Sequence, residues 1–225
     1  LPCSWRITLI THPPIREILT TDAKPAVYIV DGDRAYRDSL SQMLEEAGLK
    51  SQAFASAEAF LSSWQPNARG CLVLEAQLPG MSGAELQETL RAQRATLPLI
   101  YNTSHGSVAI AVSALKKGAI DFFEKPADHA HLLSAIHGAL SAEQKQYEHH
   151  RQELDAQRRI EQLTPREREV LELIVIGRLN KQIADDLGIS IKTVEVHRAR
   201  VMEKMGVSSL AELVQHVMIS APKDA

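Results

Sequence analysis

The chain has 225 residues, of which 44% are apolar and 24% are charged, and its formal net charge is −3. It is long enough for one large domain or two ordinary domains with buried cores. Its two cysteines, Cys3 and Cys71, exclude a disulfide framework and fit a reducing compartment, and no apolar run reaches the roughly eighteen residues of a membrane-spanning helix.

Residues 1–24 lack an initiator Met, and no basic stretch precedes a long apolar run, so the pattern of a signal peptide is missing. We expect a poorly ordered extension in this segment. The alternative is an additional strand or helix that packs on the first domain.

Residues 25–140 alternate between short apolar runs and amphipathic stretches. This alternation predicts an α/β domain, with a five-stranded parallel sheet that helices cover on both faces. The strands are expected at 27–30, 51–54, 71–74, 99–101 and 121–123. The helices are expected at 35–46, 56–61, 84–94, 107–117 and from about 128 onward. Cys71 and Tyr101 fall in strands and are expected in the core.

Polar side chains follow four of the predicted strands. Asp31 and Asp33 follow the first strand, Glu75 the third, Thr103 the fourth and Lys125 the fifth. Ligands of parallel sheets bind beyond the carboxyl ends of the strands, so we expect these side chains to form one polar pocket. Taken singly, each residue is better explained by the ordinary polarity of loops.

Residues 141–162 are polar, contain no Gly or Pro, and are predicted to continue as a helical linker. Tyr147 and Leu154 stand seven residues apart, which supports only a weak coiled-coil contact. His149 and His150 have no third ligand at a suitable spacing, so we expect no metal site there.

Residues 163–220 are predicted to form a four-helix domain. Thr164 and Glu167 have the spacing of a capping box, and glycines at 177, 188 and 206 follow the first three apolar repeats. The second and third helices meet at a tight turn around Gly188. Two helices joined in this way have the outline of a helix-turn-helix.

The third helix of this domain, expected at about 191–205, divides into an apolar stripe and a polar side. A helix in the major groove needs this division, because selective side chains face the bases and cations at the margins face phosphates. Glu195 could accept a hydrogen bond from cytosine N4, and Val196 could contact a thymine methyl group. The expected DNA contacts are Lys192, Thr193, Glu195, Val196 and His197, with Arg198, Arg200 and Lys204 on phosphates. From periodicity alone, a small helical bundle with solvated charged faces is an equal alternative.

Three segments of this region resemble the LuxR-type DNA-binding domain of the NarL/FixJ response regulators, in particular the FixJ branch. They are LTPREREVL at 163–171, NKQIA at 180–184 and SIKTVEVHR at 190–198. The resemblance covers roughly residues 160–220 without gaps. It implies a cytoplasmic transcription regulator, with no membrane partner, that binds a partly palindromic double-stranded promoter site as a homodimer and works with RNA polymerase. In that family the last helix is a dimer contact.

Residues 25–140 resemble a response-regulator receiver domain, which has a flavodoxin-like, doubly wound fold. The similar segments are IVD at 29–31, LPGMSGAEL at 78–86, KGA at 117–119 and DFFEKP at 121–126. The resemblance implies a sensor histidine kinase as partner and an aspartate that accepts its phosphoryl group. It also implies two adjacent acids that hold Mg²⁺, and a hydroxyl, a lysine and an aromatic residue that respond to the phosphoryl group. Thr103, Lys125 and Phe122 fall at the last three of these positions.

The sequence departs from the receiver pattern at two positions that take part in phosphoryl transfer in that family. Glu75 stands at the acceptor position, and Gly32 stands at the second acid position beside Asp31. The glycine removes a metal ligand, and the longer side chain of Glu75 misplaces an in-line attack. We therefore expect no cofactor and weak Mg²⁺ binding at most.

We hypothesise a pseudo-receiver whose Glu75 carboxylate pairs with Lys125 and accepts a hydrogen bond from Thr103. The alternatives are a receiver that only dimerises, a conventionally phosphorylated receiver, and a protein-binding module with an idle helix-turn-helix. We find no constellation of residues that supports a hydrolase or a redox enzyme. The predicted organisation is an extension at 1–24, a receiver-like domain at 25–140, a linker at 141–162 and a DNA-binding domain at 163–220.

Overall fold

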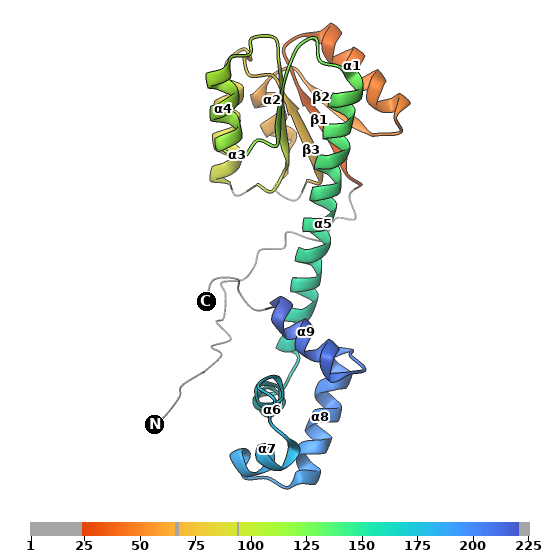
Figure 1. The fold of residues 1–225 in the computed structure, drawn as a ribbon, viewed down its shortest axis with the longest axis vertical. Coiled ribbons are helices and arrows are strands. Elements are labelled where there is room, and N and C mark those ends of the chain that lie inside the picture. Colours follow the sequence, from red (N-terminus) through yellow and green to blue (C-terminus); the bar gives the residue numbers. More distant parts are fainter. Residues whose placement is uncertain (1–23, 66–67, 94, 221–225) are drawn as a thin grey trace. The chain divides into compact units, whose positions relative to one another are not determined.

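The computed structural model describes residues 24–65, 68–93 and 95–220. These residues divide into two compact units between Tyr147 and Glu148, and each unit is described by itself (Figure 1). The prediction for residues 1–24 falls outside the described residues except for Lys24. None of the helices in the described ranges is both long enough and apolar enough to cross a membrane.

A five-stranded parallel sheet forms the centre of the first unit, as predicted. Its strands are β1 (Ala26–Val30), β2 (Ser51–Phe54), β3 (Gly70–Leu74), β4 (Leu99–Thr103) and β5 (Asp121–Glu124). The order β2-β1-β3-β4-β5 reverses direction between β1 and β3, and sheets of this kind bind ligands beyond the strand ends at such a point. Val30 pairs with Leu74, so Asp31 and Glu75 follow at neighbouring positions.

Helices cover both faces of the sheet because alternate strand residues point to opposite sides. Tyr28 and Val30 pack with the helices α2 (Ala57–Ser63), α3 (Gly83–Ala92) and α4 (Val108–Lys116), whereas Val27 and Ile29 pack with α1 (Arg34–Glu46) and α5 (His129–Glu161) (Figure 1). Cys71 and Tyr101 are buried in the strands, as predicted.

The last helix of the sheet layer and the predicted linker form one continuous helix, α5. Its first turns pack on the sheet through Leu132, Ile136 and Ala139, which are fully buried. Past residue 140 the side chains become polar, and two turns later the helix passes into the second unit.

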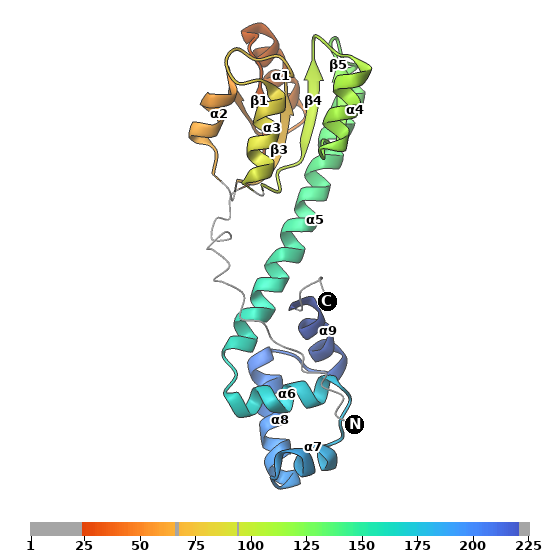
Figure 2. The same ribbon diagram turned by 90° about the vertical axis from the view of Figure 1, so that its left-hand side faces the viewer.

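Four further helices follow in the second unit, and Figure 2 shows α6, α7 and α8 grouped around a shared core. They are α6 (Pro165–Val175), α7 (Asn180–Leu187), α8 (Ile191–Met205) and α9 (Leu210–Ser220). Thr164 and Glu167 form the predicted capping box at the start of α6. Gly188 and Gly206 end α7 and α8 with φ of 64°, a left-handed conformation that glycine adopts without strain.

Gly70 is the first residue of β3, and it pairs with Ala26 of β1. Its φ is +133°, and a Cβ atom added there would lie 1.7 Å from the carbonyl oxygen of Ala26. We predict that Gly70→Ala destabilises the first unit by more than about 3 kcal/mol, because the backbone itself must move. Gly118→Ala is the matched control, since its φ is +98° but its added Cβ meets no atom within 4 Å. It should cost about 1–2 kcal/mol. Urea unfolding followed by circular dichroism measures the loss of unfolding free energy in both variants. Equal losses in Gly70→Ala and Gly118→Ala would contradict the prediction.

Candidate functional site

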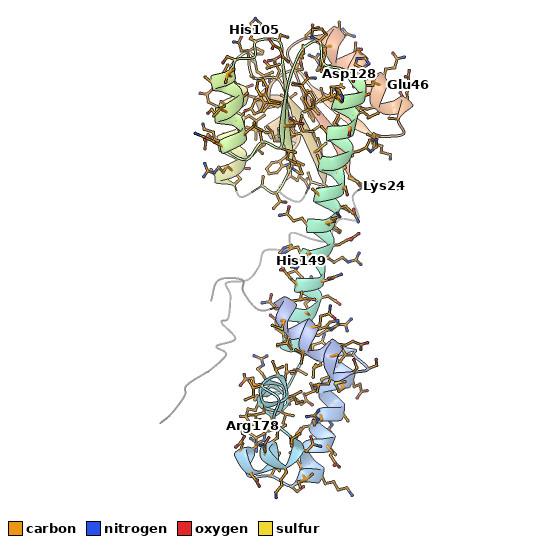
Figure 3. All side chains as sticks on the ribbon, viewed as in Figure 1. Lys24, Glu46, His105, Asp128, His149 and Arg178 are labelled. Atoms are coloured by element: carbon orange, nitrogen blue, oxygen red, sulfur yellow. The ribbon has the colours of Figure 1, made fainter. Side chains whose placement is uncertain are left out.

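The polar side chains predicted to meet at the strand ends come together in the first unit, and this cluster is called the pocket below. Asp31, Glu75, Thr103 and Lys125 meet there from four different strands, and the first three are almost fully buried. His105, labelled in Figure 3, follows β4 at the same end of the sheet, and Lys24 marks the opposite end. The pocket therefore lies where the topology of a doubly wound sheet positions a ligand site.

Glu75 uses both of its carboxylate oxygens inside this pocket. Oε1 accepts hydrogen bonds from the Thr103 hydroxyl and from the Gln77 N–H at 3.2 Å. Oε2 accepts from the Ser104 N–H at 3.0 Å and lies 3.0 Å from Lys125 Nζ. The two contacts predicted for Glu75 are thus present, and two backbone donors add to them.

These donors decide the charge state of Glu75. Burial alone would raise the pKa of its carboxyl group, but the hydrogen bonds from Thr103, Lys125, Gln77 and Ser104 outweigh burial and hold the pKa below the ordinary value. A lowered pKa means that the folded protein keeps this group ionised at neutral pH. The pocket therefore carries a fixed negative charge.

Lys125 bridges the two acids of the pocket. Its Nζ lies between Asp31 and Glu75, 3.0 Å from the latter, and 3.9 Å from the ring centroid of Tyr36. Burial would lower the pKa of Lys125, but the two carboxylates raise it above its ordinary value. The ammonium group is therefore charged, and it is fixed on three sides by its neighbours.

Asp33 does not join the pocket acids in this arrangement. Its Oδ1 accepts hydrogen bonds from the N–H groups of Ala35 at 2.8 Å and Tyr36 at 3.3 Å, so it caps the start of α1. Sequence reasoning grouped it with Asp31 because the two are close along the chain. The signal for a cap was also present, since an aspartate directly before an amphipathic run is a common helix start.

Phe122 packs beside the pocket rather than in it. Its half-buried ring lies 5.9 Å from the ring of Tyr101, within the apolar layer under α3 and α4. The Tyr101 hydroxyl donates to Gln87 Oε1 at 3.1 Å, and Gln87 Nε2 donates to the Ala114 carbonyl at 3.1 Å. Side chains thus connect the strand that carries Thr103 with α4.

In the second unit, α8 presents the division predicted for a helix that reads DNA. Val194, Val201 and Met205 are buried in the core. The exposed side chains of α8 include Lys192, Thr193, Glu195, Val196 and Arg200, whereas His197 and Arg198 are half-buried. Ser190 caps the helix by accepting from the Thr193 N–H at 3.1 Å.

Comparison with known proteins identifies both units. Residues 27–137 match the response regulator receiver domain, and residues 161–217 match the luxR family of bacterial regulatory proteins. The transcriptional regulatory protein FixJ of Azorhizobium caulinodans is 47% identical over 202 residues, which is 88% of this chain and 95% of that protein. The chain belongs to the FixJ-like response regulators. It is a two-component response regulator with a LuxR-type DNA-binding domain, and its receiver domain implies a kinase partner.

Other relatives support the same assignment over the length of both domains. The response regulator protein TmoT of Ectopseudomonas mendocina is 42% identical over 86% of this chain and 88% of its own length. Among solved structures, the response regulator StyR gives a TM-score of 0.81 at 41% identity, covering 87% of this chain and 99% of StyR. Full-length FixJ from B. japonicum gives a TM-score of 0.53 at 38% identity, covering 88% and 98%.

Receiver domains imply a bound Mg²⁺, so we tested whether this response regulator's pocket suits one. Lys125 Nζ contacts both Asp31 and Glu75, Asp33 caps α1, and Gly32 has no side chain to offer. Within the described ranges, no group of three or more His, Cys, Asp or Glu residues could hold a metal ion. The donor set does not fit Mg²⁺, which needs several well-placed oxygens.

The cations of the DNA-binding domain fall into two groups. Lys204 Nζ lies 2.7 Å from Glu167 Oε2 and 3.3 Å from the Gln162 carbonyl oxygen, so its ammonium group already binds within the domain. Sequence reasoning assigned Lys204 to a phosphate and did not anticipate this pair. Lys192, Arg198 and Arg200 have no side-chain partner among the described residues.

Several pocket and interface residues were missed from the sequence. Tyr36 and Asn102 join their side chains by a hydrogen bond at the edge of the pocket, and no local pattern marks either residue. Lys181, in the first turn of α7, is exposed and has no side-chain partner in the part of the chain that the structure describes. Its place at the start of the first helix of a helix-turn-helix could have identified it as a further cation near DNA.

The ion pair of Glu167 and Lys204 gives a prediction for stability against pH. Hydrogen bonding to Lys204 lowers the pKa of Glu167 from 4.5 to about 2, so its charge stabilises the fold above pH 4.5. This stabilisation is lost as the pH falls toward 2. Glu167→Gln removes the charge, and we expect it to cost the second unit about 1–3 kcal/mol at pH 7.

Chemical unfolding of both proteins at pH 7 and at pH 2.5 checks this prediction. The difference in unfolding free energy should shrink markedly at the lower pH. Glu203→Gln is the control, because Glu203 is exposed on α8 and has no side-chain partner among the described residues, so its cost should be small at both pH values. A Glu167→Gln difference that stays the same at both pH values would contradict the assignment.

Proposed function

We propose that this response regulator controls transcription without a phosphorylated aspartate, because Glu75 takes the position of the acceptor and supplies a permanent negative charge. The observation that carries the proposal is the simultaneous contact of the Glu75 carboxylate with Thr103 and Lys125. In receiver domains these two positions respond to the phosphoryl group. Here a carboxylate one methylene longer than aspartate holds both of them.

The same contacts argue against phosphoryl transfer to Glu75. An acceptor oxygen must be free to attack in line, and a misplacement of about 1 Å can cost about a hundredfold in rate. Both oxygens of Glu75 accept hydrogen bonds, and Lys125 Nζ contacts both Asp31 and Glu75. A kinase that contacts this receiver would, on this proposal, leave no phosphoryl group on it.

On this proposal, the protein acts by binding to a promoter. Lys192, Thr193, Glu195, Val196 and His197 remain the proposed DNA contacts. Arg198, Arg200 and Lys204 remain the proposed phosphate contacts, and Lys181 is added to them. The ammonium group of Lys204 already binds Glu167. We therefore expect Lys204 to contribute less to DNA affinity than Arg200. RNA polymerase is the partner through which a promoter-bound regulator acts.

Binding as a homodimer is part of the proposal. The apolar side chains of α9 line a groove of about 840 Å³, and Leu210 and Met218 there are 49% and 70% exposed. In LuxR-type domains the corresponding helix is a dimer contact. A two-fold symmetric protein would then read a partly palindromic operator.

Intact mass after incubation with acetyl phosphate and Mg²⁺ tests the central part of this proposal. We expect no gain of phosphoryl mass at Glu75. Glu75→Asp is the matched variant, since it shortens the side chain by one methylene and restores the residue type of an acceptor. Phosphorylation of the wild-type protein at Glu75 would overturn the proposal and favour a conventional response regulator.

The salt dependence of DNA binding tests the assignment of α8. Each phosphate contact contributes about 0.9 to the slope of log K against log salt, so Arg200→Ala should flatten that slope by about 1 and weaken binding to every sequence. Lys116→Ala removes an equal charge from exposed α4 of the receiver and should leave the slope unchanged. An unchanged slope for Arg200→Ala would count against the assignment.

A protein-binding function with an idle helix-turn-helix predicts a different result. In that case, a gel shift against random genomic fragments would enrich no fragment. Enrichment of a defined sequence with two related half-sites would support the regulator and its dimer.

A further inference from the structure

Helix α5 changes character where it leaves the sheet. Its buried apolar contacts with the sheet end with Ala139 and the half-buried Leu140, and the following residues, 141–147, are mainly polar. A polar helix without packing is marginal in water, because most helical stability in proteins comes from tertiary contacts. Something other than the apolar core must hold this segment to the receiver.

One arginine makes those contacts. Arg69 lies in the loop before β3, and its Nε and Nη2 donate to the two oxygens of Glu143 at 2.9 and 3.1 Å. Nη2 also contacts the Gln144 side-chain oxygen, and the guanidinium carbon lies 3.7 Å from the ring centroid of Tyr147. A single side chain thus engages residues 143, 144 and 147, which span more than one turn of α5.

This contact is buried, so breaking it is costly. The side chains of Arg69 and Glu143 are 11% and 10% exposed. Removing one charge of such a pair leaves the other buried and unpaired, and the planar fork of arginine matches a carboxylate with two parallel bonds. A lysine could not bond both oxygens and stack on a ring with the same geometry.

The backbone of Arg69 is itself held in place. Its carbonyl oxygen accepts from the Ala26 N–H at 3.1 Å. The next residue is Gly70, whose close approach to β1 leaves no room for a side chain. The arginine is therefore anchored to two strands of the sheet at the end from which α5 departs, which Lys24 marks in Figure 3.

We propose that Arg69 is a positioning residue that extends the receiver's hold on α5 from Leu140 to Tyr147. Arg69 contacts Tyr147, which is the last residue of the receiver's compact unit. Arg69 thus extends the stretch of α5 that the receiver constrains. Because α5 is the covalent connection to the DNA-binding domain, this extension limits how much of the helix can bend or fray between the domains. The inference does not depend on whether Glu75 is phosphorylated.

Amide hydrogen exchange of the full chain, resolved by peptide, tests this proposal. In Arg69→Met, we expect residues 141–147 to exchange at least tenfold faster than in the wild type, while residues 132–139 keep their rates. Arg91→Met is the matched control, because Arg91 is 68% exposed on α3 and its ion pair with Glu88 spans 3.9 Å. It should leave α5 unchanged.

Arg69→Met leaves the charge of Glu143 buried and unpaired. If this unfolds the receiver, a second variant still tests the proposal. The double variant Gln144→Ala/Tyr147→Ala retains the buried Arg69–Glu143 pair and removes the other two contacts. Alanine raises the intrinsic helix propensity at both positions, so a faster exchange there cannot come from propensity. We expect residues 144–147 to exchange at least fivefold faster. Wild-type exchange rates for residues 144–147 in this double variant would overturn the proposal.

Discussion

The carboxylate of Glu75 is the charge around which the receiver domain is arranged. It is buried at the ends of the strands, where an ionised group without partners would be very costly. The fold meets this requirement with a hydroxyl from β4, an ammonium group from beyond β5 and two backbone N–H groups. The donors come from three segments, which lie after β3, at the end of β4 and after β5. The charge can therefore be held only when the whole end of the sheet is in register.

Two other buried carboxylates repeat this arrangement along the chain. Glu143 of α5 is held by Arg69, and Glu167 is held by Lys204 in the DNA-binding domain. Removing one partner of such a pair leaves the other charge buried and unpaired, which is costly. Replacing both partners with apolar groups can be tolerated. The three pairs therefore make specific, breakable contacts at the pocket, at the helix that leaves the receiver, and between two helices of the output domain.

The sequence allowed the fold to be predicted because its apolar runs and glycines are local signals. Strands from β1 to β5 and the capping box at Thr164 follow from patterns within a few residues. The contact of Glu75 with Lys125 could be inferred because parallel strands bring their ends together. Asp33 was placed wrongly among the pocket acids, since a capping aspartate and a pocket aspartate look alike in sequence. Arg69 could not be found, because its partners lie 74 and more residues away. Nothing local marks such a pair.

We propose that the negative charge of Glu75 favours the DNA-binding form of the protein, and the DNA affinity of Glu75→Gln tests this most directly. Glutamine keeps the size of the side chain and its capacity to accept from Thr103, but it removes the charge beside Lys125. Coupling between sites is typically worth about 5–150-fold in affinity, so we expect Glu75→Gln to bind its operator at least about fivefold more weakly. Glu46→Gln, an exposed substitution on α1, should bind as the wild type does. If the folded Glu75→Gln protein binds DNA within twofold of the wild type, the charge at this position does not control the output.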